Sequence, residues 1–300
     1  MRQRTDSRVF DTHKWFIEAP FPGVRRCKRD VFSIEKEIYR GKTAFQEVVI
    51  FKSPGFGIML ALDGIIQLSQ ADEFIYHEMI VHVPLLSHPA PKRFLVVGGG
   101  DGGVLREACK YPLKELYQVE IDQEIVELAR KKLPFISNGA FSDKRLSIRF
   151  EDGFKVMGRY RRFFDVVVVD STDPVGPGRV LFERPFYEKV YHALTREGVA
   201  IFQLGPFLDF DPVIKRAART LQAFFPYVHP VRLPMPSYSC GSEYCFMLAS
   251  KKINPATLTP AVLTKRLASR LGTHVSSLRY YTPAMHAASL IMPKLWQLGG

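Results

Sequence analysis

The first 70 residues alternate short apolar runs with turn residues, a pattern typical of β-hairpins. Residues 45–51 (FQEVVIF) and 58–62 (IMLAL) are apolar and β-rich, and we expect a strand at each. Asp63-Gly64, the two-residue signal for a type I′ hairpin, comes next and precedes the apolar run IIQLS. The pattern predicts a small N-terminal domain of β-strands and hairpins over residues 1–70.

From Asp72 the period changes to that of a helix, in DEFIYHEMIVHV, with Pro84 near its end. Strand-like and helix-like segments then alternate, which predicts an α/β fold with a mostly parallel sheet and helices on both faces. The expected strands are 93–97, 116–121, 146–150, 165–170 and 198–204, with VLREACK, DQEIVELARKK and PFYEKVYHALT as helices among them. FPYVHPVRLP and EYCFMLASKK are expected to form a late hairpin at the sheet edge. Residues 71–300 therefore read as a Rossmann-like, methyltransferase-type catalytic domain.

The composition, with 46% hydrophobic and 24% charged residues, is that of an ordinary globular protein. No apolar run approaches the roughly 20 residues of a membrane span, and MRQRTDSRVF lacks the apolar region of a secretory signal. The cysteines lack metal-ligand spacing; they are Cys27, Cys109, Cys240 and Cys245. We expect a cytoplasmic protein with reduced thiols, no metal site and no membrane attachment.

The formal net charge of +12 raises the question of a nucleic-acid partner. The basic residues are dispersed, however, and no helix-turn-helix, zinc or aromatic RNA-binding signature accompanies them. A solvated basic surface is the favoured interpretation, with no nucleic acid bound. Against this overall charge, carboxylates concentrate in the motif-bearing third of the chain, which suits a cationic small-molecule ligand.

A glycine-rich turn, GGGDGG at residues 98–103, follows an expected strand and opens a helix, and it satisfies the G-x-G-x-x-G pattern. Glu120 ends the next strand, at the usual distance for an acid that binds ribose hydroxyls. Asp101 argues against a dinucleotide, because its carboxylate would repel a pyrophosphate on the backbone amides of this turn. A positively charged nucleoside without phosphate, such as an adenosyl sulfonium, fits better. Helix capping, the alternative role for Glu120, suits Asp122 better.

Two further acidic positions follow strands. Asp152, in EDGF, is placed to accept a hydrogen bond from an adenine amino group, with Gly153 allowing close approach, although helix capping is an alternative role. The four valines before Asp170 deliver that carboxylate, and Asp173 after it, to the start of a Pro/Gly loop. Because burying an aspartate is costly without a partner, we expect a cation there. Residues 171–184 are interpreted as a lid.

Six motifs together resemble, in order and spacing, the polyamine aminopropyltransferases, spermidine synthase above all. They are LDGIIQ (62–67), DEFIYHEM (72–79), GGGDGGVLRE (98–107), VEID (119–122), EDGF (151–154) and DSTDPVGP (170–177). The similarity runs from about Trp15 to about Lys251. It implies transfer of the aminopropyl group of decarboxylated S-adenosylmethionine, a co-substrate, to an amine, with putrescine as first choice. Spermidine and methylthioadenosine would be the products, in a homodimer or homotetramer without a further cofactor.

The resemblance also implies which residues bind the two substrates. Those for the donor and methylthioadenosine are Gln46, Asp101, Glu120, Asp152, Gly153 and Pro177. Those for the polyamine are Gln67, Tyr76, His77, Asp101, Asp170, Asp173, Tyr238 and Trp15. Tyr76 and His77 lie on the expected amphipathic helix that begins near Asp72, and one of the two could be a core residue instead. Asp72 or Glu73 could simply cap that helix.

The chemistry of the implied reaction assigns roles to these side chains. An acceptor amine has a pKa of roughly 10 and is protonated at neutral pH, so a carboxylate must hold it and remove its proton. Asp170 is the candidate proton acceptor, assisted by the Tyr76 hydroxyl. Asp173 would steer the amine, and Asp101 would hold the donor's terminal ammonium while repelling the carboxylate of S-adenosylmethionine.

Two segments depart from the family pattern where the acceptor should bind. QLGPFLDF (203–210) lacks the expected glutamate and tryptophan, and PSYSCGSEYCF (236–246) carries an apparent extra residue. Agmatine, cadaverine or spermidine (giving thermospermine or spermine) therefore stay open as acceptors. A small-molecule methyltransferase and a non-catalytic polyamine-binding homologue are the alternatives from other classes.

Overall fold

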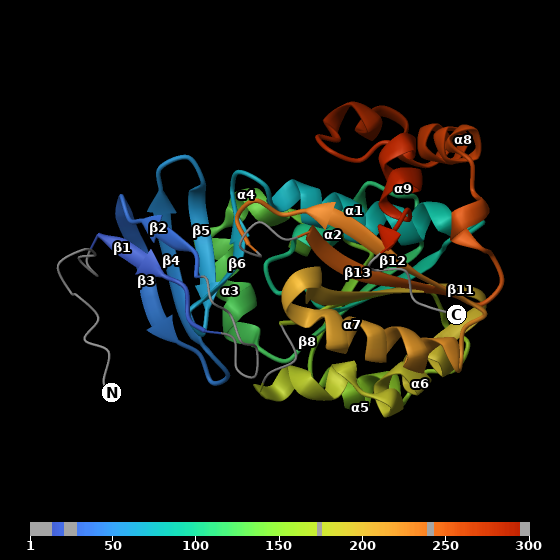
Figure 1. The fold of residues 1–300 in the computed structure, drawn as a ribbon, viewed down its shortest axis with the longest axis horizontal. Coiled ribbons are helices and arrows are strands. Elements are labelled where there is room, and N and C mark those ends of the chain that lie inside the picture. The colour runs from blue at the N-terminus through green and yellow to red at the C-terminus, as the bar shows by residue number, and fades with distance from the viewer. Residues whose placement is uncertain (1–13, 21–28, 173–175, 239–242, 295–300) are drawn as a thin grey trace.

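A computed structural model describes residues 14–20, 29–172, 176–238 and 243–294. Its N-terminal part holds two antiparallel sheets (Figure 1). One pairs β1 (Trp15–Ile17) with β2 (Val31–Ser33), and the other runs β3-β4-β5-β6. The strands of the second are β3 (Lys36–Lys42), β4 (Glu47–Ser53), β5 (Gly57–Leu62) and β6 (Ile65–Ser69).

The turn between β5 and β6 has the expected geometry. Asp63 and Gly64 both adopt positive φ, 48° and 76°, as a type I′ turn requires. The Asp63 carboxylate also accepts a hydrogen bond from the Glu47 amide at 2.8 Å, which ties the turn to the start of β4. The hairpins expected from the sequence are confirmed. β3 was not expected, because KEIYRGK is mostly exposed and lacks a clear apolar alternation.

The rest of the chain builds a seven-stranded sheet in the order β12-β13-β11-β10-β7-β8-β9. The five strands from β11 to β9 are parallel, while β13 and β12 add an antiparallel hairpin at one edge. The bounds are β7 (Arg93–Gly98), β8 (Glu115–Glu120), β9 (Leu146–Phe150), β10 (Phe164–Asp170), β11 (Leu194–Pro206), β12 (Tyr227–Pro234) and β13 (Glu243–Ser250). Both the mostly parallel sheet and its edge hairpin agree with the prediction from the sequence.

Helices cover both faces of this sheet (Figure 1). They are α1 (Glu73–Ser87), α2 (Gly103–Cys109), α3 (Gln123–Lys132), α4 (Pro134–Ser137), α5 (Gly153–Met157), α6 (Arg184–Ala193), α7 (Phe207–Gln222), α8 (Pro260–Leu271) and α9 (Pro283–Ser289). The short 3₁₀ helices are η1 (Ala140–Ser142), η2 (Gly176–Phe182), η4 (Pro255–Thr257) and η5 (Gly272–Ser277). No helix in the described part of the chain is both long and apolar enough to cross a membrane.

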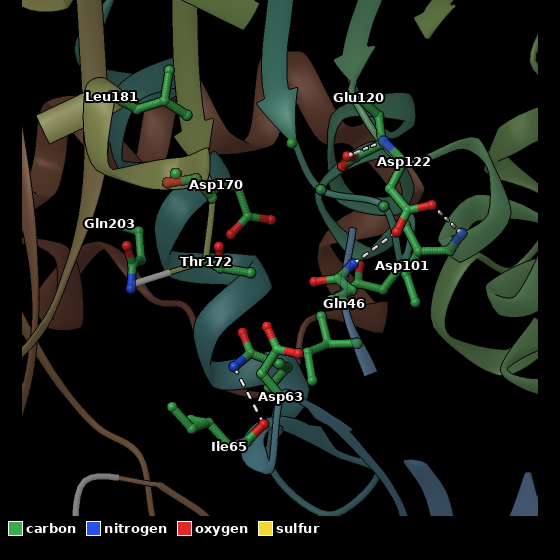
Figure 2. A pocket seen from close by; sticks show the side chains of 18 of the residues that line it. Gln46, Asp63, Ile65, Asp101, Glu120, Asp122, Asp170, Thr172, Leu181 and Gln203 are labelled. Carbon is green, nitrogen blue, oxygen red and sulfur yellow. Dashed lines mark hydrogen bonds between the residues drawn. The ribbon is translucent and has the colours of Figure 1, made fainter. Parts of the chain in front are cut away.

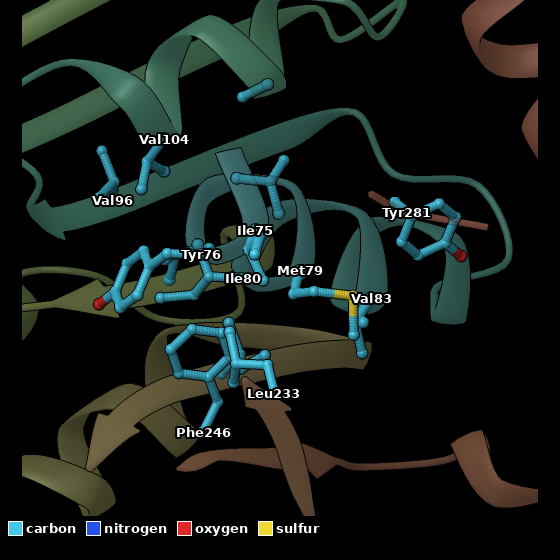
Figure 3. Packing of buried hydrophobic residues seen from close by; sticks show 14 of the residues in the cluster. Ile75, Tyr76, Met79, Ile80, Val83, Val96, Val104, Leu233, Phe246 and Tyr281 are labelled. Atoms are coloured by element: carbon cyan, nitrogen blue, oxygen red, sulfur yellow. The ribbon is translucent and has the colours of Figure 1, made fainter. Parts of the chain in front are cut away.

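Strand β10 explains why two layers of helices are needed. Val166 and Val168 face the core formed with α1, α2 and α8, and Val167 and Val169 face the core formed with α5, α6 and α7. A strand buried on both faces reads as a continuous apolar run. Figure 3 shows the first of these cores, with Tyr76 and Ile80 of α1 packed between Val96 and Val104 on one side and Phe246 on the other.

Two further packings fix α1 and the N-terminal sheet. Residues of β4, β5 and β6 share a third apolar core with Ile125 of α3 and Ile136 of α4. On the other side, Arg266 and Arg270 of α8 donate to main-chain carbonyls at the C-terminal end of α1. The Glu78 carboxylate of α1 accepts hydrogen bonds from three successive amides, of residues 279–281. The C-terminal segment of the chain thus anchors helix α1.

Candidate active site

A cavity of about 370 Å³ opens at the carboxyl ends of β7, β8 and β10, with β5, β6 and α1 closing its other walls. The order of the parallel strands reverses between β7 and β10, and ligands in such sheets bind at that point. Gly98 and Asp170 pair there across the two strands. Gly98 has φ of 88°, and a Cβ on it would lie 2.0 Å from the Asp170 carbonyl oxygen, so only glycine fits.

Asp170 and Tyr76 form the centre of the cavity. The Tyr76 hydroxyl donates to Asp170 Oδ1 at 2.6 Å. Burial, and then the charge of Asp101, raise the pKa of Asp170 to about 6. Burial and the Asp170 charge raise the pKa of Tyr76 well above its usual value, so the phenol stays protonated and donates. A carboxylate with a pKa near 6 can both exist as an anion at neutral pH and accept a proton.

Asp101 lies on the glycine-rich turn beside this pair. Its Oδ1 accepts a hydrogen bond from the Gly103 amide at 2.7 Å, and its Oδ2 lies 3.5 Å from His77 Nε2. The other ring nitrogen of His77 lies 2.6 Å from Glu73 Oε2. Although burial alone would lower the pKa of His77, these two carboxylates outweigh it and raise it to about 10. In turn, His77 outweighs the effect of burial on Asp101 and holds the pKa of Asp101 below its usual value.

Both members of the Tyr76 and His77 pair line the cavity, so neither is only a core residue. The two capping candidates at the start of α1 have other roles. Asp72 stands at the N-cap position, yet its carboxylate accepts from the hydroxyls of Ser69 and Ser237 and from the Ser237 amide. The Glu73 carboxylate is bonded to the side chains of His77 and Arg106.

At the far side of the cavity, Glu120 ends β8 and is buried (Figure 2). Its Oε1 accepts the Asp122 amide at 3.0 Å, and burial raises the pKa of Glu120 to about 7. Asp122 is the cap of α3, accepting the amides of Glu124 and Ile125, as the sequence suggested. Its other oxygen accepts from the Gln46 side chain at 3.0 Å, which places Gln46 on this wall of the cavity.

Asp152 caps a helix and also lines the cavity, and its predicted hydrogen bond to adenine stays a prediction. Its Oδ1 caps α5 by accepting the Phe154 amide at 2.8 Å, and the residue also lines the cavity. Gly153, which lines the cavity as well, packs against Val97, since a Cβ there would lie 2.6 Å from a Val97 methyl carbon. The segment after β9 therefore places a polar side chain at the same edge of the sheet as Glu120.

Opposite Glu120, the cavity is walled by polar side chains, most of them amides and phenols. Tyr238 donates its hydroxyl to the Gln67 carbonyl at 2.9 Å, and Gln203 donates its side-chain amide to the Tyr244 hydroxyl at 2.5 Å. Glu18, which also lines this part, is buried and accepts the Ile66 amide at 3.2 Å. Tyr238 and Gln67 were expected here from the sequence. Gln203, Tyr244 and Glu18 were not assigned.

Other predicted residues are not placed in the cavity by the described structure. Asp173 lies outside the described residues, and for Pro177 only its backbone position in η2 is described. Trp15 is in β1, paired with Ser33, and is not among the described residues that line the cavity. Gly178, Val180 and Leu181 of the expected lid do line it. The lid itself, and the roles of Trp15, Asp173 and Pro177, stay predictions.

Chemically, the cavity is lined by several carboxylates. One of the central ones, Asp170, accepts a hydrogen bond from the protonated phenol of Tyr76. Such a site can hold one or more ammonium groups and accept a proton from one of them. Among the described residues, no group of three or more side chains is arranged to hold a metal ion. Of the cysteines, the described Cys109 and Cys245 are free thiols, while Cys27 and Cys240 lie outside the described residues.

Comparisons with known proteins agree with this geometry. Residues 73–259 match the family model of the spermine/spermidine synthase domain, and residues 14–70 match that of the spermidine synthase tetramerisation domain. The polyamine aminopropyltransferase of Caldicellulosiruptor saccharolyticus is 40% identical over 286 residues, covering 94% of this chain and 96% of that protein. That of Erwinia tasmaniensis is 41% identical over 267 residues, covering 88% and 91%.

Solved structures show the same similarity. A spermidine synthase in complex with the transition state analogue AdoDATO superposes with a TM-score of 0.87 at 33% identity, covering 95% of this chain and 94% of that one. The spermidine synthase from Thermotoga maritima superposes with a TM-score of 0.84 at 31% identity, covering 95% and 93%.

Proposed function

The chain belongs to the spermine/spermidine synthase family and is an aminopropyltransferase, and from this premise we propose that it transfers the aminopropyl group of decarboxylated S-adenosylmethionine to putrescine. The products would be spermidine and methylthioadenosine. The observation that carries the proposal is the Tyr76–Asp170 pair, with Asp101 beside it, in a cavity whose far end holds Glu120 and Asp152.

In the proposed reaction, the amine nitrogen of the acceptor attacks the methylene carbon next to the donor's sulfonium. The carbon–nitrogen bond forms as the carbon–sulfur bond breaks, and the bonding pair passes to sulfur, which leaves as the neutral thioether of methylthioadenosine. Asp170 accepts the proton that the amine must lose, and Tyr76 keeps its carboxylate oriented through the hydrogen bond to Oδ1.

The positions of the carboxylates suggest how the donor would lie in the cavity, with its adenosyl part towards Glu120 and its aminopropyl chain towards Asp101 and Asp170. Glu120, with Gln46 and Asp152 near it, would hold the ribose and adenine, and Gly153 and Pro177 would complete that part. Asp101 would hold the donor's terminal ammonium. Gln67, His77, Asp173, Tyr238 and Trp15 are the proposed surroundings of the polyamine.

The acceptor is the finer part of the proposal. The wall opposite Glu120 carries Gln203, Tyr238 and Tyr244, which offer hydrogen bonds and aromatic surface to an aliphatic diamine. Agmatine, cadaverine and spermidine remain the alternative acceptors. We also propose a homo-oligomer, a dimer or tetramer, supported by the match of residues 14–70 to a tetramerisation domain. A cytoplasmic location is part of the same proposal.

The test is to incubate the protein with decarboxylated S-adenosylmethionine and each amine in turn, and to identify the products by mass. We expect methylthioadenosine together with spermidine, formed fastest from putrescine. Faster transfer to another amine would replace putrescine as the acceptor, and methyl transfer from S-adenosylmethionine without aminopropyl transfer would contradict the proposed function.

A further inference from the structure

His77 occupies an unusual position for a histidine that lines a cavity. It is only 2% exposed, and each ring nitrogen faces a carboxylate, Glu73 at 2.6 Å and Asp101 at 3.5 Å. A neutral imidazole has one N–H and one lone pair, so it would point a lone pair at one of these anions. The doubly protonated imidazolium satisfies both.

The ring is also fixed in place sterically. A Cβ on Gly103 would lie 2.3 Å from His77 Cε1 and 2.4 Å from Nε2, so the imidazole packs directly on the glycine backbone at the start of α2. Gly103 is the last glycine of the G-x-G-x-x-G pattern. In this chain, that glycine is needed to accommodate a side chain of α1.

The charge on Glu73 is already matched by a second cation. Arg106 of α2 donates to both oxygens of Glu73, at 3.1 and 2.8 Å. Arg106 also donates to Glu107, which in turn contacts Lys110 and His82. Because Arg106 already balances the charge of Glu73, the positive charge of His77 is available to balance that of Asp101.

The remaining groups around His77 explain why a cation is needed. His77 faces Glu73, which it shares with Arg106, together with Tyr76 and Asp101. Its charge also acts on Asp170 at the end of β10 and opposes the rise in the pKa of that carboxyl. When two carboxylates share a buried site, each raises the pKa of the other, so the second loses its proton only at a higher pH. The proposed reaction needs both ionised, Asp101 to hold an ammonium and Asp170 to accept a proton.

We propose that His77 is a positioning residue whose imidazolium allows Asp101 and Asp170 to be ionised together. This inference rests on the proposed function for its kinetic consequence. His77 would therefore lie in the surroundings of the polyamine without binding its ammonium group. It would act through Asp101, since its two N–H groups are directed at carboxylates and a cation would repel an ammonium. Burial alone would raise the pKa of Asp101, but the charge of His77 outweighs burial and holds that pKa below its usual value, which is consistent with this role.

The first test is the pH dependence of kcat/KM for putrescine, with decarboxylated S-adenosylmethionine as donor. In the unmodified enzyme we expect the acidic limb near the pKa of Asp170, about 6. In His77→Gln the limb should move up by about 1–3 pH units, the usual effect of one nearby charge, and the rate should recover at high pH. His77→Lys, which keeps a positive charge, should move the limb back.

A matched control is His82→Gln, on the same helix. His82 is buried and bonded to Glu107 and Tyr111, away from the cavity, so its loss should leave the acidic limb in place. Binding of methylthioadenosine, which carries no ammonium, checks that each variant is folded. If His77→Gln lowers kcat/KM equally at every pH, the role is only structural and the proposal is wrong.

A second measurement needs neither substrate nor variant. NMR of the imidazole nitrogens in the free protein should show His77 doubly protonated up to about pH 9, below its pKa of about 10. Titration of His77 near the usual histidine value of about 6.5 would overturn the proposal even if His77→Gln did not fold. If instead no amine is aminopropylated by the unmodified protein, the proposed function fails, while this titration still decides the state of His77.

Discussion

Strand β10 carries one aspartate near its start, Asp165, and one at its end, Asp170, and the fold treats them in opposite ways. The Asp165 carboxylate accepts hydrogen bonds from the amides of Lys92 and Arg93 at 2.9 and 3.0 Å, and from the Thr195 hydroxyl at 3.0 Å. Among the described residues, only Tyr76 donates a hydrogen bond to the Asp170 carboxylate, which faces the cavity (Figure 2). Asp165 joins the starts of three neighbouring strands. Asp170 keeps acceptor capacity for a ligand.

The comparison shows how donors decide the use of a carboxylate. A carboxylate whose oxygens are occupied by backbone amides is a structural link, and removing it leaves those donors without a partner. A carboxylate near another anion, with one phenol as donor, is held closer to its protonated form and can accept a proton from a substrate. The same residue type on one strand thus supplies stability at one end and chemistry at the other.

The largest expected effect is on turnover. Asp170→Asn should lower kcat by about 10²–10⁴, the usual contribution of a general base, while methylthioadenosine binds as before. Asp165→Asn, the same change on the same strand, is the matched control and should leave kcat within about threefold. An Asp170→Asn enzyme that turns over normally at saturating amine would remove Asp170 from the role of base.

The next effect is on affinity for the donor. Asp101→Asn should weaken decarboxylated S-adenosylmethionine by about 10- to 100-fold, because a hydrogen bond to a charged group contributes about 1.5–3 kcal/mol. Methylthioadenosine, which lacks the ammonium, should lose much less. Calorimetry with both ligands makes the comparison. Equal losses would mean that Asp101 supports the glycine-rich turn and does not bind the donor's chain.

The smallest effect is on stability, and here the two aspartates should differ in sign. Asp165→Ala removes three hydrogen bonds and should lower the free energy of unfolding by about 1–3 kcal/mol. Since the pKa of Asp170 is raised to about 6 in the folded protein, the fold favours its neutral form. Above pH 6 the ionised group therefore costs stability. Asp170→Asn should unfold at an equal or higher temperature at pH 8, and a lower melting temperature would contradict this.

Much of the fold could be predicted from the sequence because its strands are continuous apolar runs. The valines of β10 and the Asp63-Gly64 turn determine local structure by themselves. Strand β3 could not be identified, because its pairing with β4 depends on the tertiary fold and its residues are mostly exposed. Helices α8 and α9 were not assigned either, although Thr259 and Thr282 cap them before a proline, which is a readable helix start.

The site could be predicted where residues follow strands directly, because parallel strands bring their carboxyl ends to one edge. Asp101, Glu120, Asp152 and Asp170 line the cavity for that reason. Contacts between distant segments could not be predicted. Glu18 reaches the cavity only because the chain after β1 lies beside β6. The i,i+4 spacing of Glu73 and His77 was a signal for their pairing, but the meeting of His77 with Asp101 depends on how α1 packs on the turn.

The most direct test of the central claim, that Asp170 is the base, is the pH dependence of kcat/KM for putrescine in the unmodified enzyme and in Asp170→Asn. Because only ionised Asp170 can accept the proton, and its pKa is about 6, we predict that the rate falls about tenfold for each pH unit below 6 and levels off above it. In Asp170→Asn the residual rate should show no such limb. A rate without an inflection near pH 6, or the same inflection in both proteins, would contradict the assignment.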